Sequence, residues 1–139
     1  MAARQASCVA IGDRALLIEG PSGSGKSILA LALIDRGALL IGDDGVILHT
    51  RDGTLFAGPH PNTRGLLEVR NLGLLQFPVC EEAAVALVLR LDEAAPRFIE
   101  AAESCNVDGI TLPMLRLQPG NPVLAIKAEL ALDRYGLRP

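Results

Sequence analysis

Residues 20–27 read GPSGSGKS, and this stretch dictates how the chain around it must fold. It matches G-x-x-x-x-G-K-[ST], the pattern of a loop whose backbone N–H groups turn toward phosphate oxygens. In such a loop Lys26 reaches the β- and γ-phosphates of a nucleotide, and Ser27 offers its oxygen to Mg²⁺. The residues predicted to bind the nucleotide are Gly20, Ser22, Gly23, Ser24, Gly25, Lys26 and Ser27.

The sequence on either side of this loop predicts the strand and the helix that the pattern requires. Two apolar runs flank the short turn Gly12-Asp13, which predicts a β-hairpin, and the second run ends directly at the loop. After the loop, SILALALIDRG (27–37) is apolar at nearly every position, as in a buried helix. Gly37 is a good C-terminal stop for that helix. The N-terminal end of this helix, which carries the positive end of the helix dipole, would point at the phosphate site.

The remaining apolar runs predict more strands than helices. AAVALVLRL (83–91) predicts a central strand, because it is continuous, branched and uncharged until Arg90. GITLPMLRL (109–117) predicts a late strand, and ALLIGDDGVILHT (38–50) is an apolar run interrupted by two aspartates. We therefore expect a single α/β domain over residues 1–139, with a mixed β-sheet and few helices.

Prolines mark segments that are expected to lie outside strands and helices. LFAGPHPNTRG (55–65) is expected to be a loop because two prolines interrupt it, and Pro96 is expected to break a helix-like stretch. The last helix is predicted at 121–132, with Asn121 as its N-cap and Pro122 at the first helical position.

The composition narrows the classes of function. Half of the 139 residues are apolar but only 3% are aromatic, so the core must be aliphatic, as in a sheet covered by helices. The net charge is −3 without a basic stripe, so we expect neither a nucleic-acid partner nor a membrane partner. The sequence shows no apolar run of 18 residues and no secretory signal, which favours a cytoplasmic location.

The three cysteines are expected to be small apolar fillers in a reducing compartment. Cys8, Cys80 and Cys105 are far apart, odd in number and without a C-x-x-C pair. We therefore predict neither a disulfide framework nor a zinc site.

Asp43 and Asp44 follow an apolar run, where a second protein ligand for Mg²⁺ is expected. Two adjacent carboxylates repel each other unless a cation or a proton lies between them. This suggests that one carboxylate holds Mg²⁺ and that the other takes a proton from an incoming hydroxyl group. An Asp-Asp-Gly turn with solvated side chains is the alternative interpretation. The chain carries neither an [N/T]KxD motif nor an obvious sensor arginine, which favours phosphoryl transfer to an acceptor over a conformational switch.

Together, GPSGSGKS, DRGALLIGDDGV and RGLLEVRNLG resemble the HPr(Ser) kinase/phosphorylase family, and specifically its compact form with only the catalytic domain. The resemblance spans roughly residues 5–130. The loop alone is shared by many families, but GDD at this distance is more restrictive. It is followed by a signature of the type [IL]-E-[IV]-R-[GN]-[IL]-G, which reads LEVRNLG at 67–73.

The resemblance implies an ATP-dependent kinase that phosphorylates a serine of HPr, the small phosphocarrier protein of the sugar phosphotransferase system. Some members of the family use pyrophosphate in place of ATP, and all of this chemistry uses Mg²⁺. The same site runs the reverse reaction, in which inorganic phosphate attacks phosphoserine and gives pyrophosphate. The implied fold is a P-loop domain like that of phosphoenolpyruvate carboxykinase, and family members are commonly hexamers.

The resemblance also implies roles for single residues. Asp43 matches the catalytic aspartate, which is the base in the kinase direction and the acid in the reverse direction. Asp44 is assigned to the metal site together with Ser27, although the roles of the two aspartates could be exchanged. Arg70 matches the signature, where a guanidinium could bind the transferring phosphoryl group or pair with Glu68. The expected catalytic residues are Asp43, Lys26 and Arg70.

Three departures from the family pattern set limits on this interpretation. Gln5 stands where members usually carry a histidine, and Ile28 stands where an acidic residue usually follows Lys-Ser. QPGNP (118–122) lacks both arginines of a loop found in longer members, as expected of the compact form. The first two departures weaken the prediction of an efficient reverse reaction.

The sequence contains two histidines. His49 and His60 are interpreted as surface residues rather than catalytic ones. A catalytic role is given more weight for His60 than for His49, because His60 precedes the signature.

A small-molecule kinase with the same loop is one alternative function. A nucleotide-binding regulator that has lost catalysis is the other, and Gln5 and Ile28 slightly favour it.

Overall fold

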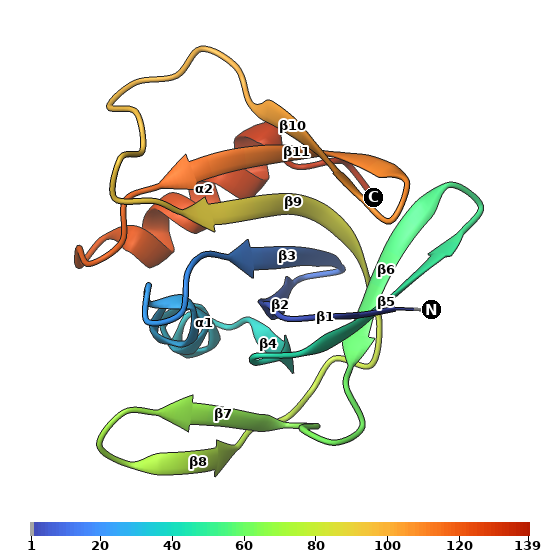
Figure 1. Ribbon diagram of the computed structural model, residues 1–139, viewed down its shortest axis with the longest axis vertical. Helices are drawn as coiled ribbons and strands as arrows, with labels where there is room; N and C mark the ends of the chain where they lie inside the picture. The colour runs from blue at the N-terminus through green and yellow to red at the C-terminus, as the bar shows by residue number, and fades with distance from the viewer. Residues whose placement is uncertain (1) are drawn as a thin grey trace.

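The computed structural model describes residues 2–139, which form eleven strands and two helices (Figure 1). The strands are β1 (Ala2–Arg4), β2 (Ser7–Ile11), β3 (Arg14–Glu19), β4 (Leu39–Gly42), β5 (Val46–Arg51), β6 (Thr54–Pro59), β7 (Leu66–Val69), β8 (Gly73–Gln76), β9 (Ala83–Leu91), β10 (Glu103–Val107) and β11 (Ile110–Leu117). The helices are α1 (Lys26–Asp35) and α2 (Leu124–Tyr135). The expected mixed α/β fold, in which strands outnumber helices, is confirmed.

Nine of the strands form one curled mixed sheet, and the other two form a separate hairpin (Figure 1). The order across the main sheet is β1-β5-β6-β9-β3-β2-β4, and β11 pairs with β9 and carries β10 on its other side. β7 and β8 pair only with each other and lie beyond α1 and β4 in Figure 1.

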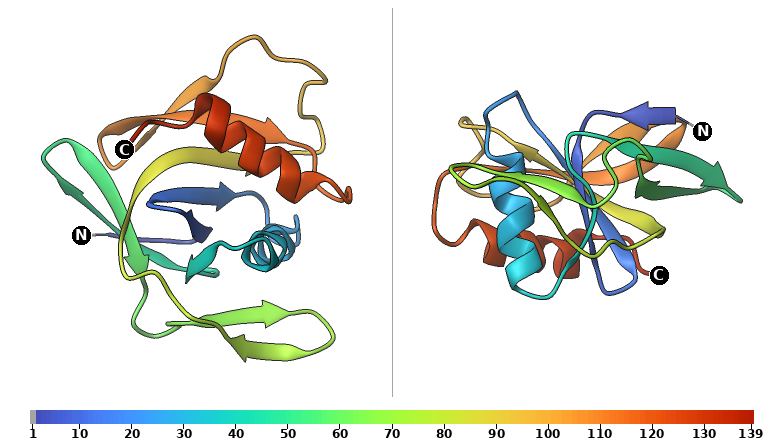
Figure 2. Two further views of the ribbon diagram at one scale, coloured as in Figure 1. Left: turned by 180° about the vertical axis from the view of Figure 1, so that it is seen from behind. Right: turned by 90° about the horizontal axis from the view of Figure 1, so that it is seen from below.

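The core lies on both faces of the sheet, because the central strands are buried on both sides. Leu16 and Ile18 of β3 belong to a cluster that includes the buried faces of α1 and α2, whereas Leu17 belongs to a second cluster with β5 and β6. Figure 2 shows α2 lying across β9 and β11. A strand buried on both faces must be apolar at successive positions, which explains the continuous apolar runs in the sequence.

Strand direction brings four chain segments to one edge of the sheet. β3, β9 and β11 run parallel to one another. β4 runs in the same direction as β3, because both are antiparallel to β2, which lies between them. The carboxyl ends of parallel strands are the usual position of ligand sites in α/β proteins. The glycine loop, the two aspartates and the segments after β9 and β11 therefore meet at this edge.

Several predicted elements are confirmed. The hairpin around Gly12-Asp13 is β2–β3, the helix after the loop is α1, and the central strand 83–91 is β9. Gly37 ends α1 with a left-handed φ of 109°, and its N–H donates to the carbonyl oxygen of Ile34. The N–H of Ala38 donates to the carbonyl oxygen of Leu33, so the helix ends in a Schellman motif.

The prediction of a loop at 55–65 is wrong in its first half, because most of that half belongs to strand β6. Leu55 and Ala57 are buried and alternate with more exposed residues, which is the period of a strand. Pro59 is the last residue of β6, where the missing N–H costs the ladder little. The stretch that Pro96 was expected to break contains no helix, since residues 92–102 form turns and irregular backbone.

The final helix also begins and ends later than predicted. Regular helix starts at Leu124, its N-cap residue is Val123, and it continues to Tyr135. Asn121 lies before the helix, where its Oδ1 accepts a hydrogen bond from the N–H of Val123 at 3.2 Å. The N–H of Leu124 bonds to the carbonyl oxygen of Asn121, a tight turn that delays the α-helical pattern.

Candidate phosphate-transfer site

The glycine loop joins the end of β3 to the start of α1. Gly25 directly precedes the helix with a left-handed φ of 105°, a conformation that glycine adopts without steric cost. The ammonium group of Lys26 folds back over the loop and donates to the carbonyl oxygens of Gly20 at 2.8 Å and Pro21 at 3.3 Å. The lysine charge therefore lies at the start of the loop, while the helix N-terminus lies at its end.

Asp43 connects the loop to two other parts of the chain. Its carboxylate is buried, with 7% of the residue exposed, and Oδ1 accepts hydrogen bonds from the hydroxyl groups of Ser27 at 2.7 Å and Ser7 at 2.8 Å. Its Oδ2 accepts from the N–H of Glu68 at 3.3 Å. The structure therefore places Asp43 beside the loop.

Asp44 points elsewhere and is exposed. It has a left-handed φ of 60°, which aspartate tolerates better than most residues, and its Oδ1 accepts from the side-chain amide of Gln5 at 3.1 Å. The sharp turn after β4 thus directs the two neighbouring carboxylates to different partners, and the mutual repulsion expected of them is reduced.

A cavity of 380 Å³ contains most of the predicted site residues. Arg70, from the loop of the β7–β8 hairpin, lines this cavity together with Lys26 and Ser27. Among the ion pairs within residues 2–139, none joins Arg70 to Glu68. Arg64 turns away to a bidentate pair with Glu81, whose pKa that pairing lowers. The lining residues are Ser7, Ser22, Gly23, Gly25, Lys26, Ser27, Ile28, Asp43, Asp44, Glu68 and Arg70.

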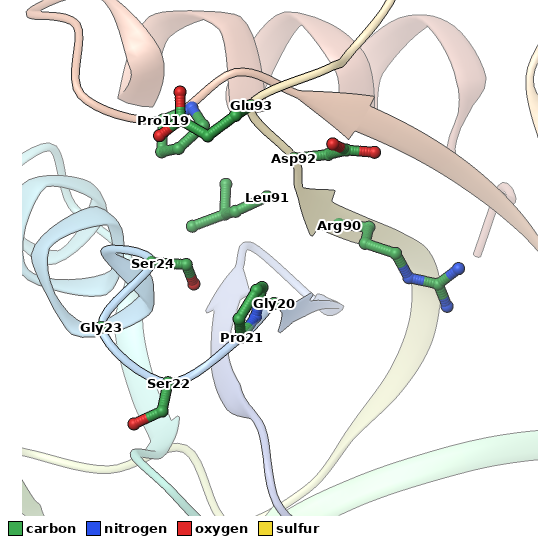
Figure 3. Close-up of a pocket in the computed structure, with 10 residues that line it drawn as sticks. All are labelled: Gly20, Pro21, Ser22, Gly23, Ser24, Arg90, Leu91, Asp92, Glu93 and Pro119. Carbon is green, nitrogen blue, oxygen red and sulfur yellow. The ribbon is translucent and has the colours of Figure 1, made fainter.

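A larger cavity, of 660 Å³, borders the other side of the loop between Gly20–Ser24 and the end of β9 (Figure 3). Its lining includes the carboxylates of Asp92 and Glu93 but not Lys26. The guanidinium of Arg90 points away from the loop in Figure 3 and donates to Glu19 at 3.0 Å. Two carboxylates and an already paired arginine make this cavity a poor phosphate site, although it is the largest one bordering the loop.

Neither histidine lies in the 380 Å³ cavity. His49 contacts Glu82 at 3.1 Å and stacks on Phe56, and Nδ1 of His60 accepts from the N–H of Asn62. Both make these contacts with residues outside that cavity. All three cysteines are free, and burial raises the pKa of the Cys8 thiol, with Cys80 adding to the rise.

The site suits a cation that takes few protein ligands. Within residues 2–139 no three His, Cys, Asp or Glu side chains cluster as a ready-made metal site. Ser27 directs its hydroxyl proton to Asp43, which leaves the lone pairs of its oxygen free. A hydroxyl oxygen and a carboxylate, completed by phosphate oxygens and water, are the ligands that Mg²⁺ prefers in phosphoryl-transfer sites.

Sequence reasoning missed Ser7 as a contributor to the site, and it treated Gln5 only as a departure from the family pattern. Ser7 lies on β2 and is only 1% exposed, and Gln5 precedes that strand. Both residues reach the aspartates because β2 lies beside β4 in the sheet. A hydroxyl residue in an otherwise apolar strand was the one available signal for Ser7. Within residues 2–139, neither helix is long and apolar enough to cross a membrane.

These features define a mixed α/β domain with a glycine loop and an aspartate pair at the carboxyl edge of its sheet. The family model described as HPr Serine kinase C-terminal domain matches residues 2–106. The HPr kinase/phosphorylase of Clostridium novyi (strain NT) is 35% identical, and that of Clostridium botulinum (strain Eklund 17B / Type B) is 38% identical. Each alignment covers 88% of this chain and 45% of the relative.

The chain belongs to the family of the HPr serine kinase C-terminal domain. It spans a little under half the length of the curated relatives it matches. The solved structure of the Hpr(Ser) kinase/phosphatase from Coxiella burnetii has the same fold, with a TM-score of 0.84 at 24% identity over 96% of this chain and 95% of that one.

Proposed function

We propose that this chain is an ATP-dependent serine kinase acting on an HPr-like phosphocarrier protein. The observation that carries the proposal is the 2.7 Å hydrogen bond from Ser27 to Asp43, which joins the loop to an aspartate in one cavity with Lys26 and Arg70. Family membership supports the reaction class. We further infer that the domain is related to that of phosphoenolpyruvate carboxykinase.

The proposed reaction is an in-line transfer of the γ-phosphoryl group of ATP. The acceptor serine oxygen forms a bond to the γ-phosphorus while the bond from that phosphorus to the β,γ-bridging oxygen breaks, and ADP leaves. The serine proton goes to the carboxylate of Asp43. Lys26 and Arg70 both line the cavity, and their positive charges would oppose the negative charge that develops on the transferring group.

Ser27 and Asp44 are the proposed ligands of Mg²⁺, which when bound supplies charge neutralisation at the β- and γ-phosphates. One contact supports the exchanged assignment. It is Asp43, not Asp44, that accepts a hydrogen bond from the hydroxyl group of Ser27. In that arrangement Asp43 holds the metal and the exposed Asp44, positioned by Gln5, takes the proton. The two assignments differ in which aspartate is needed for the Mg²⁺-dependent part of ATP binding.

We propose that the reverse reaction, attack of inorganic phosphate on phosphoserine to give pyrophosphate, is the weaker direction. The amide of Gln5 contacts Asp44 and the side chain of Ile28 lines the cavity. Neither group titrates or carries charge near neutral pH, so neither can donate a proton or help to balance the charge of an incoming phosphate.

Incubation of the chain with Mg²⁺, labelled ATP and an HPr-like carrier tests the function. We expect label on a carrier serine, and we expect Asp43→Asn to lower transfer by about 10²–10⁴-fold, the usual effect of losing a general base. Under the first assignment, calorimetric ATP affinity stays the same in Asp43→Asn. Under the exchanged assignment, its Mg²⁺-dependent part is lost in Asp43→Asn and retained in Asp44→Asn.

Asp133→Asn is the matched control, because Asp133 is exposed near the C-terminal end of α2 and lines none of the cavities that border the loop. It should transfer label at the wild-type rate. ATP binding without transfer to any carrier would contradict the kinase and support a nucleotide-binding regulator. Transfer to a metabolite hydroxyl but not to a carrier protein would support a small-molecule kinase.

A further inference from the structure

A third cavity, of 540 Å³, opens where both helices begin. One wall is the first two turns of α1, and the other is the segment 119–122 together with the first turn of α2. Its volume lies within the range of about 300–1,000 Å³ that is usual for small-molecule sites. The lining is mostly apolar, with Ile28, Leu29 and Ala32 on the side of α1.

This cavity adjoins the proposed phosphate site. Gly23, Gly25 and Ile28 line both the 380 Å³ cavity and the 540 Å³ cavity. Ile28 is an unusually exposed apolar residue, with 64% of its surface accessible, and it lies at the boundary between the two. A ligand that passes over the helix N-terminus can therefore occupy both cavities at once.

The loop itself indicates which way a nucleotide must run. The charge of Lys26, which pairs with the β- and γ-phosphates, lies over Gly20 and Pro21 at the start of the loop. The terminal phosphate consequently lies on that side, and the α-phosphate lies toward the first residues of α1. The group attached to the α-phosphate then leaves the loop past Ile28.

We propose that the 540 Å³ cavity binds the nucleoside half of ATP, an inference that rests on the proposed kinase function. The apolar walls at Ile28 and Ala32 on one side, and at Pro122 and Ala125 on the other, contact the base. Both helices begin at this cavity, so their positive ends also face the phosphate chain that enters it.

In the described part of the chain, two polar side chains that line the cavity have no hydrogen-bond partner, namely those of Glu93 and Ser24. Within residues 2–139 the carboxylate of Glu93 has neither a hydrogen bond nor an ion pair, and it lines the cavity as an acceptor for ribose hydroxyl groups. The amide of Asn121 is already used, by the carbonyl oxygen of Gln118 and by the N–H of Val123.

The larger cavity of Figure 3 is a poorer nucleoside site. It borders Gly20–Ser24, the part of the loop over which the lysine charge lies, and no residue of α1 lines it. A nucleoside placed there would reverse the phosphate chain and move the γ-phosphate away from Asp43 and the acceptor side.

Binding of two probes, Mg²⁺-ATP and Mg²⁺-tripolyphosphate, tests the inference by calorimetry. Both contain the triphosphate chain, but only ATP has a nucleoside. In Ala32→Phe the new ring fills the cavity from the side of α1, so ATP affinity should fall at least tenfold while tripolyphosphate affinity stays within twofold of wild type. Ile28→Thr, at an exposed position that leaves the core intact, should weaken ATP binding about threefold and tripolyphosphate binding by less, because Ile28 also lines the phosphate cavity.

Ala101→Phe is the matched control, because Ala101 is exposed on the loop after β9 and lines none of the cavities described above. It should bind both probes like wild type. Equal loss of both probes in Ala32→Phe and Ile28→Thr, or no loss of ATP affinity in either, would overturn the nucleoside site. Failure of wild-type chain to bind either probe would instead overturn the proposed function.

Discussion

Glu19 is the last residue before the glycine loop, and two arginines hold it in place. Its Oε2 accepts from Nε of Arg4 at 2.6 Å and its Oε1 accepts from Arg90 at 3.0 Å, with 13% of the Glu19 side chain exposed. The cluster joins β1, β3 and β9 at the edge of the sheet where the loop begins. The carboxylate therefore fixes the point from which the loop departs.

We predict that Glu19→Gln lowers the free energy of unfolding by about 1–3 kcal/mol, because two guanidinium groups lose their shared, largely buried counter-charge. Urea unfolding followed by circular dichroism measures the change. Glu129→Gln is the control, since it removes one partner of the more exposed pair with Arg36 and should cost at most about 1 kcal/mol. Equal effects of the two substitutions would show that the Glu19 cluster adds nothing beyond a surface pair.

At the scale of elements, the turn between β4 and β5 decides where the two aspartates point. A Cβ atom at Gly42 would lie 2.7 Å from Cγ1 of Val46 and closer still to the carbonyl oxygen of Gly45. The turn is therefore closed so tightly that only glycine fits at its first position. This close approach places the carboxylate of Asp43 beside Ser27, while Asp44 turns toward Gln5.

We predict that Gly42→Ala costs about 1–3 kcal/mol of stability, because the turn must open to admit the methyl group. Transfer activity should fall with it, since Asp43 moves relative to Ser27. Gly45→Ala is the matched control in the same turn, where the nearest atoms to an added Cβ are 3.9 Å away. Gly42→Ala should therefore unfold at a lower temperature than Gly45→Ala and should transfer less label in the label-transfer assay. Wild-type values for Gly42→Ala would contradict the tight-turn account.

At the scale of the whole molecule, exposed apolar side chains gather on α2. Leu130 is 61% exposed and Ile126 is 41% exposed, although α2 buries its opposite face against β9 and β11. Contiguous apolar surface of this kind marks an interaction site more often than a free surface. Family resemblance led us to expect a hexamer. We expect this exposed face of α2 to form part of the interface between its subunits.

We predict a solution mass near six times the 14.6 kDa of one chain, measured by light scattering after size exclusion at micromolar concentration. Leu130→Glu should lower that mass by charging the exposed face of α2. Phe98→Glu changes a still more exposed apolar residue, on the loop after β9, and should leave the mass unchanged. A mass of one chain for the wild type would contradict the expected assembly.

The sequence by itself determined the local features of this protein. GPSGSGKS predicted the loop and the helix after it, and AAVALVLRL predicted the central strand, because each depends on backbone preferences or periodicity within a few residues. The loop expected at 55–65 was wrong in its first half, because neighbouring strands on both sides outweigh the local effect of a single terminal proline.

Only the tertiary structure decided what converges on the loop. Ser7 and Gln5 reach the aspartates because β2 lies between β3 and β4, and Arg70 reaches the cavity because the β7–β8 hairpin packs beside α1. The proposed nucleoside cavity needs both helices to begin at one edge, which follows from parallel β3 and β11. Strand order and direction are set by packing between distant segments, and no single stretch of sequence carries that information.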